Sequence, residues 1–417
     1  MDRRDFLKSA LALAALAPLA KLHAKAGADG DKSSDVVSEP GVTRRRYKET
    51  AMTLPLLGFG CMRLPRLSPD KPEIDFDTAA KMIDMAMKAG CNYFDTAYMY
   101  HNGLSERFLG EALKKYPRDS YYLTDKMPVW FAKTPGDIEK IFNEQLKRCQ
   151  TEYFDFYLLH SLDENHWSEA QKLRACEFLD RMKKEGKITY LGFSNHASPE
   201  TLRRFADAHK WDFAQIQMNY LDWEFSTSEE EYNILTERNI PVVVMESVRG
   251  GRLSNLTPEL NAKLEAAQPG RSVSSWAFRW LMRHENVMVM LSGMSTMEQV
   301  EDNLKTFESD CALSDEQCAF LKEVAHEFKK SLTVPCTACR YCTDDCPQQL
   351  DIPGLLRVYN DYKYDGWWHK GMLKDFAEDK LPSNCLGCGT CTGHCPQGID
   401  IPSYMKKLAN LQETGKE

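Results

Sequence analysis

The sequence has no excess of positive charge, and its glycines and prolines are not gathered into low-complexity segments. Its formal net charge is −8, which argues against a nucleic-acid-binding surface, because such a surface needs a basic patch. The 23 glycines and 19 prolines are spread along the chain, which excludes a repetitive linker-like protein. With 417 residues and 43% hydrophobic residues, the chain has a globular composition and the length of about two to three domains.

The apolar run near the N-terminus is too short to span a bilayer. It covers residues 10–20, whereas a membrane-spanning helix needs about 20 residues. The run has the length of a signal-peptide core, and Arg3-Arg4-Asp5-Phe6-Leu7-Lys8 before it resembles a twin-arginine export signal. We therefore predict a signal peptide over residues 1–26 and a periplasmic location. A chance basic start before an apolar helix is the alternative.

A dinucleotide-binding glycine fingerprint is missing after the first predicted strand. Gly58-Phe59-Gly60 has no third glycine and is followed by Cys61 rather than by a helix start. From about residue 53 to 310, however, short β-branched or apolar runs alternate with amphipathic helical stretches such as 77–89 and 169–184, within a predicted domain of residues 50–330. This alternation predicts a (β/α)8 TIM barrel, with a doubly wound sheet as the alternative. The predicted strands are 55–59, 92–95, 121–125, 154–159, 189–193, 213–218, 241–246 and 287–291. The stretch 27–49 before them is predicted to be a solvated linker, with Arg44, Arg45 and Arg46 on its surface.

Polar residues follow the predicted strands at several successive ends. In a barrel of this kind the carboxyl ends of the strands carry the reactive groups, so these residues predict a single site. They are Asp95, Asp125, Lys126, His160, Ser194, Asn195, His196, Gln215, Gln217 and Asn219.

These residues stand in motifs that resemble the aldo-keto reductase superfamily over about residues 50–310. The motifs are Leu57-Gly-Phe-Gly-Cys-Met-Arg-Leu-Pro65, Phe94-Asp-Thr-Ala-Tyr-Met-Tyr100, Ser105-Glu106, Leu159-His160, Gly192-Phe-Ser-Asn195 and the late Asn303. The resemblance implies a catalytic tetrad of Asp95, Tyr100, Lys126 and His160, and an oxidoreductase that interconverts a carbonyl and an alcohol.

The chemistry that the resemblance implies fits the residue types of the tetrad. Tyr100 would act as the acid, because reduction of a carbonyl leaves charge on an oxygen that must be protonated. A phenol has an ordinary pKa near 10, and a neighbouring Lys126 ammonium lowers that pKa. Asp95 would keep Lys126 charged, and His160 would orient the carbonyl. Tyr98 is expected to pack in the loop.

The resemblance also implies a nicotinamide cofactor. Ser194, Asn195 and Gln217 would bind its carboxamide, and Asn303, with Asp302, would meet its adenine. Gln299 stands where relatives that prefer NADP carry an arginine, so NADP and NAD both remain open. A flavin is possible, but no sequence motif supports it.

Eight of the 14 cysteines form two copies of one C-x2-C-x2-C-x3-C-P run. This run is typical of bacterial ferredoxins with two 4Fe–4S clusters, in which the fourth cysteine of each run binds the other cluster. Zinc is the alternative. The stretches 353–362 and 370–379 look helical, so residues 331–417 are predicted to be a mainly α-helical ferredoxin-type domain. The predicted ligands are Cys336, Cys339, Cys342, Cys346, Cys385, Cys388, Cys391 and Cys395. The other six cysteines are expected to be buried thiols, with a disulfide of unassigned pairing as the alternative in an exported protein.

Together these features predict an exported iron–sulfur oxidoreductase that acts on a small-molecule carbonyl or alcohol, with clusters that relay electrons to or from a redox partner protein. We predict no nucleic-acid partner and no integral membrane segment. The alternatives are an electron-transfer protein whose barrel is a scaffold and a binding protein whose clusters are structural. Two features of this prediction conflict with its chemistry. Clusters pass single electrons, whereas a nicotinamide passes a hydride. Export also separates the protein from the cytoplasmic nucleotide pool.

Overall fold

The computed structural model describes residues 36–37, 41–48, 50–68, 73–309, 311–336, 338–343, 345–395 and 397–417. The predicted signal peptide, residues 1–26, lies outside the described residues. Within them, no helix has both the length and the apolar character of a membrane span.

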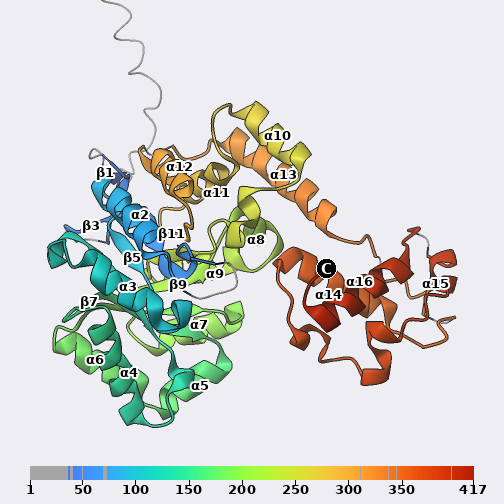
Figure 1. Cartoon of the computed structure of the whole chain (residues 1–417), viewed down its shortest axis with the longest axis horizontal. Coiled ribbons are helices and arrows are strands. Elements are labelled where there is room, and N and C mark those ends of the chain that lie inside the picture. The colour runs from blue at the N-terminus through green and yellow to red at the C-terminus, as the bar shows by residue number, and fades with distance from the viewer. Residues whose placement is uncertain are drawn as a thin grey trace, which may run out of the picture. The chain divides into compact units, whose positions relative to one another are not determined.

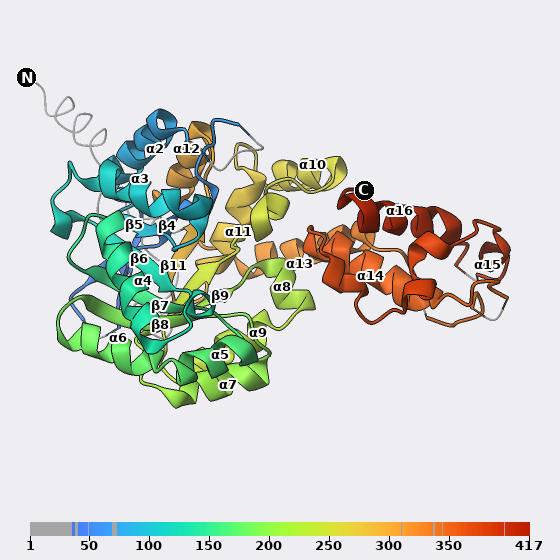
Figure 2. The ribbon, with the colours of Figure 1, turned by 60° about the horizontal axis from the view of Figure 1, so that its bottom comes forward.

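Eight parallel strands close into a barrel, and helices surround it (Figures 1 and 2). This confirms the predicted (β/α)8 fold, and every predicted strand overlaps one of the barrel strands. The strands pair in sequence order, and β11 closes the barrel against β4. Their bounds are β4 (Leu57–Gly60), β5 (Tyr93–Asp95), β6 (Tyr122–Met127), β7 (Phe154–Leu162), β8 (Ile188–Asn195), β9 (Phe213–Gln217), β10 (Val242–Met245) and β11 (Val287–Ser292).

The barrel helices bury their apolar faces on the strands, and most begin with a side-chain cap. Asp75, for example, accepts a hydrogen bond from the backbone N–H of Thr78 at 3.1 Å, which satisfies one of the free donors at the helix start. The predicted helix 169–184 is interrupted, because Arg174 takes a left-handed conformation (φ 54°) between α5 and α6. The helices are α2 (Phe76–Lys88), α3 (Leu104–Leu113), α4 (Pro135–Arg148), α5 (Glu164–Lys172), α6 (Ala175–Lys184), α7 (Pro199–Ala208), α8 (Tyr220–Phe225), α9 (Ser228–Glu237), α10 (Pro258–Ala267), α11 (Val273–Leu281), α12 (Met297–Phe307) and α13 (Asp315–Leu332).

A small antiparallel sheet precedes the barrel and corrects the surface prediction for Arg45, whereas Arg46 is exposed as predicted. Its strands are β1 (Val36–Val37), β2 (Arg44–Arg46) and β3 (Thr53–Pro55). Arg45 is 7% exposed rather than on the surface, and its guanidinium donates to the carbonyls of Met282 and His284. Those carbonyls lie just before β11, so the arginine ties the sheet to the amino-terminal side of the barrel.

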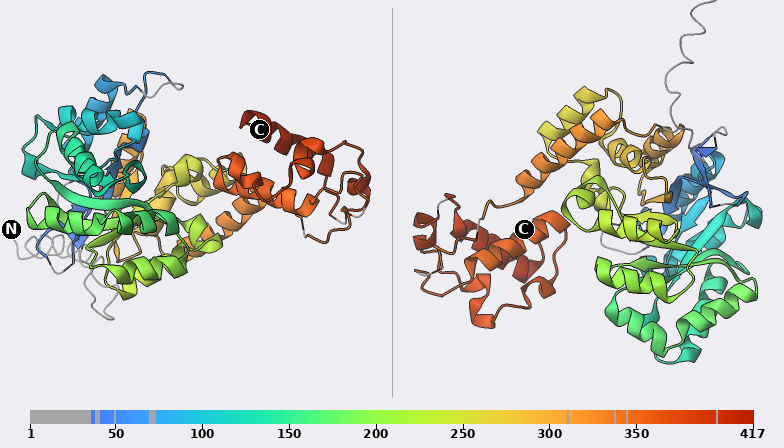
Figure 3. Two further views of the ribbon diagram at one scale, coloured as in Figure 1. Left: turned by 90° about the horizontal axis from the view of Figure 1, so that it is seen from below. Right: turned by 180° about the vertical axis from the view of Figure 1, so that it is seen from behind.

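The C-terminal region consists of two long helices joined by loops and short helical turns. The long helices α14 (Ile352–Asp365) and α16 (Ile401–Thr414) pack side by side (Figure 3), and the short α15 (Thr390–Gly393) lies between them in sequence. The prediction of a helix over 370–379 is wrong. That stretch contains only short 3-10 turns at Lys370–Leu373 and Glu378–Lys380.

Candidate functional site

The four predicted tetrad residues meet at the carboxyl end of the barrel. Asp95 ends β5, Lys126 lies near the end of β6, and His160 lies in β7. Tyr100 begins a 3-10 turn, Tyr100–Gly103, in the loop after β5. Parallel strands present their carboxyl ends at the same rim of a barrel, so residues far apart in sequence become neighbours.

A buried ion pair is the centre of this group. The Lys126 Nζ lies 2.5 Å from an Asp95 carboxylate oxygen and donates to the Thr96 carbonyl at 2.6 Å. The second Asp95 oxygen accepts a hydrogen bond from the Gln215 amide at 3.1 Å. Burial acts to lower the pKa of Lys126, but the neighbouring Asp95 carboxylate and Tyr100 outweigh it, so the pKa is raised. Lys126, which is fully buried, therefore stays charged.

Tyr100 faces the charged end of Lys126. The Nζ lies 4.8 Å from the centroid of the Tyr100 ring. Burial raises the pKa of Tyr100 above its ordinary 10.0, and Lys126 opposes that rise. Lys126 thus acts in the predicted direction but does not reverse the effect of burial. The phenol is therefore protonated at neutral pH and available as a proton donor.

His160 completes the group as a neutral imidazole. Its ring centroid lies 6.2 Å from that of Tyr100 and 5.3 Å from that of Trp130. Burial, together with the charge of Lys126, holds the pKa of His160 well below 6.5. A neutral imidazole can donate one hydrogen bond to a carbonyl oxygen. Trp130 also stacks on His166, with ring centroids 4.6 Å apart.

A second set of contacts fixes the loop that carries Tyr100. The Ser105 hydroxyl lies 2.8 Å from the Thr96 hydroxyl, and Glu106 forms a buried ion pair with Arg148 at 2.7 Å. The guanidinium of Arg148 lies 4.3 Å from the centroid of the Tyr98 ring, and the Tyr98 hydroxyl donates to Glu144 at 2.9 Å. Tyr98 is thus held in loop packing, as predicted.

The predicted cofactor residues are distributed unevenly. Asn303 and Gln217 line two adjoining cavities, whereas Ser194 and Asn195 line neither of these two. The Ser194 hydroxyl accepts from the Ser161 backbone N–H at 2.6 Å. The Asn195 amide bonds to the Ala197 backbone and to Glu231.

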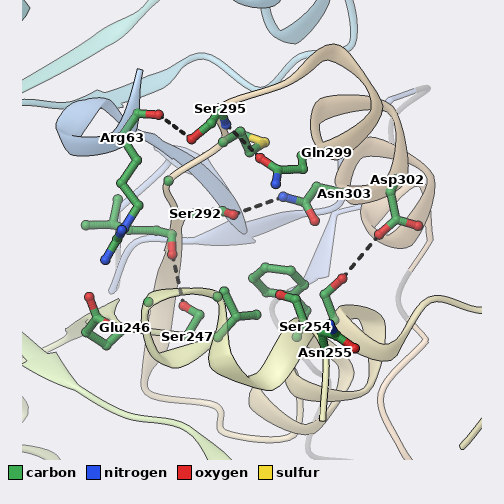
Figure 4. A pocket seen from close by; sticks show the side chains of 18 residues that line it. Arg63, Glu246, Ser247, Ser254, Asn255, Ser292, Ser295, Gln299, Asp302 and Asn303 are labelled. Atoms are coloured by element: carbon green, nitrogen blue, oxygen red, sulfur yellow. Dashed lines mark hydrogen bonds between the residues drawn. The ribbon is translucent and has the colours of Figure 1, made fainter. Parts of the chain in front are cut away.

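The first cavity is a cleft of about 420 Å³ between the loops after β10 and β11 (Figure 4). Asn303 is 5% exposed and donates to the Ser292 hydroxyl at 2.9 Å. Gln299 accepts from the Ser295 backbone N–H at 2.7 Å, at the amino-terminal end of α12. This lining suits an extended ligand that carries phosphate, because it offers serine hydroxyls, the start of a helix and exposed backbone at Gly250, Gly251 and Gly293.

Sequence reasoning missed most of the residues on this cleft. Gly250 and Gly251 both have positive φ angles, 64° and 95°, and a glycine pair in the loop after the predicted strand 241–246 would have been a usable indication. Among the described residues, Arg63 is the one cation that lines the cleft. The missed residues are Arg63, Glu246, Ser247, Gly250, Gly251, Ser254, Asn255, Ser274 and Ser295.

The cysteines of the two runs surround two further cavities. One is lined by Cys385, Cys388 and Cys391 together with Cys346 of the other run. The second is lined by Cys336, Cys339 and Cys342 together with Cys395. Among the described residues, no three metal-binding side chains lie close enough to share one ion, so the thiols are spread around a space instead. This crossed arrangement fits the ferredoxin pattern, in which the fourth cysteine binds the other cluster.

The remaining six cysteines are free thiols. Cys61, Cys91 and Cys149 are buried, as predicted. The other three, Cys176, Cys311 and Cys318, are half-buried.

Comparison with known proteins supports both parts of the chain. Residues 56–326 match the Aldo/keto reductase family, and residues 335–399 match the 4Fe-4S dicluster domain. Among solved structures, the holo form of aldo-keto reductase AKR11C1 from Bacillus halodurans has a TM-score of 0.56 and 25% sequence identity, and the match covers 68% of this chain and 95% of that chain.

Two curated relatives show the same likeness in sequence. Probable aldo-keto reductase 1 of Glycine max is 29% identical over 195 residues, which cover 45% of this chain and only 54% of that relative. NADH-specific methylglyoxal reductase of Escherichia coli (strain K12) is 24% identical over 330 residues, which cover 67% of this chain and 98% of that protein. The barrel, its site and these matches together show that the chain belongs to the aldo/keto reductase family, as an oxidoreductase fused to a 4Fe–4S ferredoxin-like domain.

Proposed function

We propose that the chain reduces a carbonyl group to an alcohol, or catalyses the reverse reaction, with a nicotinamide nucleotide in the cleft near Asn303. The observation that carries this proposal is the placement of a charged Lys126 between Asp95 and the ring of Tyr100. When bound, the nucleotide supplies or accepts the hydride. Tyr100 donates the proton to the carbonyl oxygen, and His160 orients that oxygen. Positioned proton transfer of this kind contributes about 10²–10⁴-fold in rate.

We further propose that NADH is preferred over NADPH. Gln299 and Asp302 line the cleft, and an acidic side chain there would repel a 2′-phosphate, while a neutral amide cannot form the bidentate contact of an arginine. The Escherichia coli relative with NADH specificity supports this choice.

The decisive experiment is to denature anaerobically purified protein and to identify any released nucleotide by mass spectrometry, together with titration of the native protein with NADH and NADPH. Tight NADH binding supports the proposal, and Gln299→Arg should then shift the preference toward NADPH. Absence of binding to either nucleotide would overturn it. Release of a flavin would show that the barrel site binds a flavin rather than a nicotinamide nucleotide.

We also propose that the eight cysteines bind two 4Fe–4S clusters that exchange electrons with a redox partner protein. The crossed arrangement of the thiols supports two clusters. Because each hydride carries two electrons and each cluster passes one at a time, this route requires an intermediate carrier. A flavin is the chemical class that performs this conversion.

Export by the twin-arginine route is the remaining proposal, and Arg3-Arg4 before the apolar residues 10–20 supports it. Cell fractionation tests it. The native chain should be found in the periplasm, and the Arg3→Lys/Arg4→Lys variant in the cytoplasm. Equal distribution of the two would overturn export by this route.

A further inference from the structure

The end of helix α14, in the ferredoxin-type domain, contacts the loop after β10 of the barrel. Two arginines of that loop, Arg249 and Arg252, both donate to the carbonyl of Tyr364, and the Arg252 bond measures 2.7 Å. The Arg249 guanidinium lies 3.9 Å from the centroid of the Tyr364 ring and 3.4 Å from the Asp365 carboxylate. A cation held over an aromatic face and against a carboxylate makes a specific contact.

A buried carboxylate connects this contact to the barrel site. The side chain of Asp222, in α8, is 2% exposed and forms an ion pair with Arg249 at 2.9 Å. One of its oxygens accepts a hydrogen bond from the Tyr364 hydroxyl at 3.1 Å. The other accepts from the amides of Gln217 at 2.7 Å and Asn219 at 2.6 Å. Tyr364 and Gln217 therefore hold the same carboxylate from opposite domains.

The two domains also share the wall of the second cavity. This cavity, of about 880 Å³, is lined by Gln217, His196 and Arg63 of the barrel and by Asp365, Gly366 and Trp367 of the ferredoxin-type domain. It adjoins the cleft that contains Asn303, because Arg63, Glu246 and Gly250 line both. Residues directly after α14 therefore stand beside the candidate nucleotide site.

We propose that Tyr364 is a positioning residue of the nucleotide site, which acts on Gln217 through Asp222. Asp222 accepts from the Gln217 amide nitrogen, which fixes the orientation of the amide group. The amide oxygen is then held in place to accept a hydrogen bond from the ligand. Nucleotide binding and the docking of α14 are then coupled, and each strengthens the other by the same factor. This inference rests on the proposed function, because it requires that the cleft binds a nicotinamide nucleotide.

Tyr364→Phe tests the coupling, since it removes the hydroxyl but keeps the ring beside Arg249. The expected result is a dissociation constant for NADH about fivefold higher, within the usual range of coupling between sites. The KM for NADH should rise while kcat at saturating nucleotide stays unchanged, because the lost contact affects ground state and transition state alike. The cluster absorbance should not change.

Tyr404→Phe is the matched control. It makes the same chemical change in the same domain, but Tyr404 packs on Tyr359 at 5.1 Å rather than on the barrel. Its affinity for NADH should equal that of the native protein. An unchanged affinity in Tyr364→Phe overturns the inference while leaving the proposed function intact, whereas a native protein that binds no NADH or NADPH overturns the proposed function itself.

A measurement on the native protein covers the case in which Tyr364→Phe folds poorly. Saturating NADH should slow amide hydrogen exchange along Ile352–Asp365, because linkage is reciprocal. The corresponding helix Ile401–Thr414 should change less. Equal exchange in Ile352–Asp365 with and without bound NADH would contradict the coupling.

Discussion

In the barrel, the candidate site draws its side chains from strands spread over much of the chain, whereas in the C-terminal domain each set of cysteines comes from two short loops. Asp95, Lys126 and His160 are held by buried protein contacts such as the 2.5 Å ion pair. The cysteine cavities are lined mainly by thiols and apolar side chains. The barrel site is therefore shaped by the protein alone, whereas the cysteine loops depend on the group that the thiols bind.

The two cysteine loops are themselves near copies with one instructive difference. Corresponding positions take the same left-handed backbone conformation, with Ala338 and Arg340 in the first loop and Gly387 and Gly389 in the second. Their helices α14 and α16 start at corresponding residues and both end at a left-handed glycine. The repeat thus requires a backbone shape, and only the second loop meets it with residues that adopt it without strain.

The largest expected effect is a loss of turnover that depends on the barrel site and not on the clusters. Tyr100→Phe should lower turnover about 10²–10⁴-fold, because it removes the proton donor, while iron content and cluster absorbance stay unchanged. Steady-state assays and iron analysis measure both. Tyr404→Phe is the matched control, since Tyr404 packs on Tyr359 in the ferredoxin-type domain, and it should keep its turnover. Full turnover in Tyr100→Phe would support the alternative of a scaffold barrel.

Removing one partner of the buried ion pair should destabilise the barrel. Lys126→Met leaves Asp95 charged without its partner, which costs about 3–5 kcal/mol. Denaturant unfolding followed by tryptophan fluorescence measures the loss. The double variant Lys126→Met/Asp95→Leu should recover part of it, because no buried charge then remains. A single variant as stable as the native protein would show that water reaches the site.

Replacing one cysteine should test the crossed arrangement of the loops. Cys346→Ser should impair the cluster bound by Cys385, Cys388 and Cys391 of the other loop, and leave roughly half of the iron. Hydrogen exchange should then increase in the second loop rather than in the first. Cys318→Ser, outside the two runs, is the control and should keep all of the iron. Faster exchange confined to the first loop would contradict the crossing.

Two substitutions at corresponding left-handed positions should change stability in opposite directions, with a loss on removing a glycine and a gain on introducing one. Gly387 has φ 67° and nothing within 4 Å of an added Cβ, so Gly387→Ala should cost about 1 kcal/mol through backbone strain alone. Ala338→Gly, at φ 55°, should relieve a similar strain and slow the loss of cluster absorbance in denaturant. Changes of the same sign in both variants would show that the loops differ in more than these residues.

The smallest expected effect is a pH dependence from His160. Its folded pKa is held well below 6.5 by burial and by Lys126, so the unfolded chain binds a proton more readily than the folded chain. The stability of the barrel should therefore fall as pH drops below about 6.5, where unfolded histidine becomes protonated. His160→Gln should flatten that part of the curve in denaturant titrations at several pH values. If the free energy of unfolding of His160→Gln still falls with pH as in the native protein, groups other than His160 cause the acid sensitivity.

The sequence by itself determined the order of strands and helices, because period and length of apolar runs are local properties. It also determined the cysteine spacing and the types of residue at strand ends. The error at residues 370–379 arose because helical periodicity there is overridden by short turns between the cysteine loops. Arg45 was wrongly predicted on the surface because its charge alone does not reveal the carbonyls that it reaches, such as that of Met282.

Only the tertiary structure decided which residues meet. Asp95 and Gln215 bond across the barrel, and the cleft lined by Gly250, Ser292 and Asn303 forms where two loops far apart in sequence converge. The raised pKa of Tyr100 depends on its burial, and the chain from Tyr364 through Asp222 to Gln217 depends on how α14 docks. These properties arise from individual contacts between distant segments, which the strand-end pattern and the cysteine spacing did not specify.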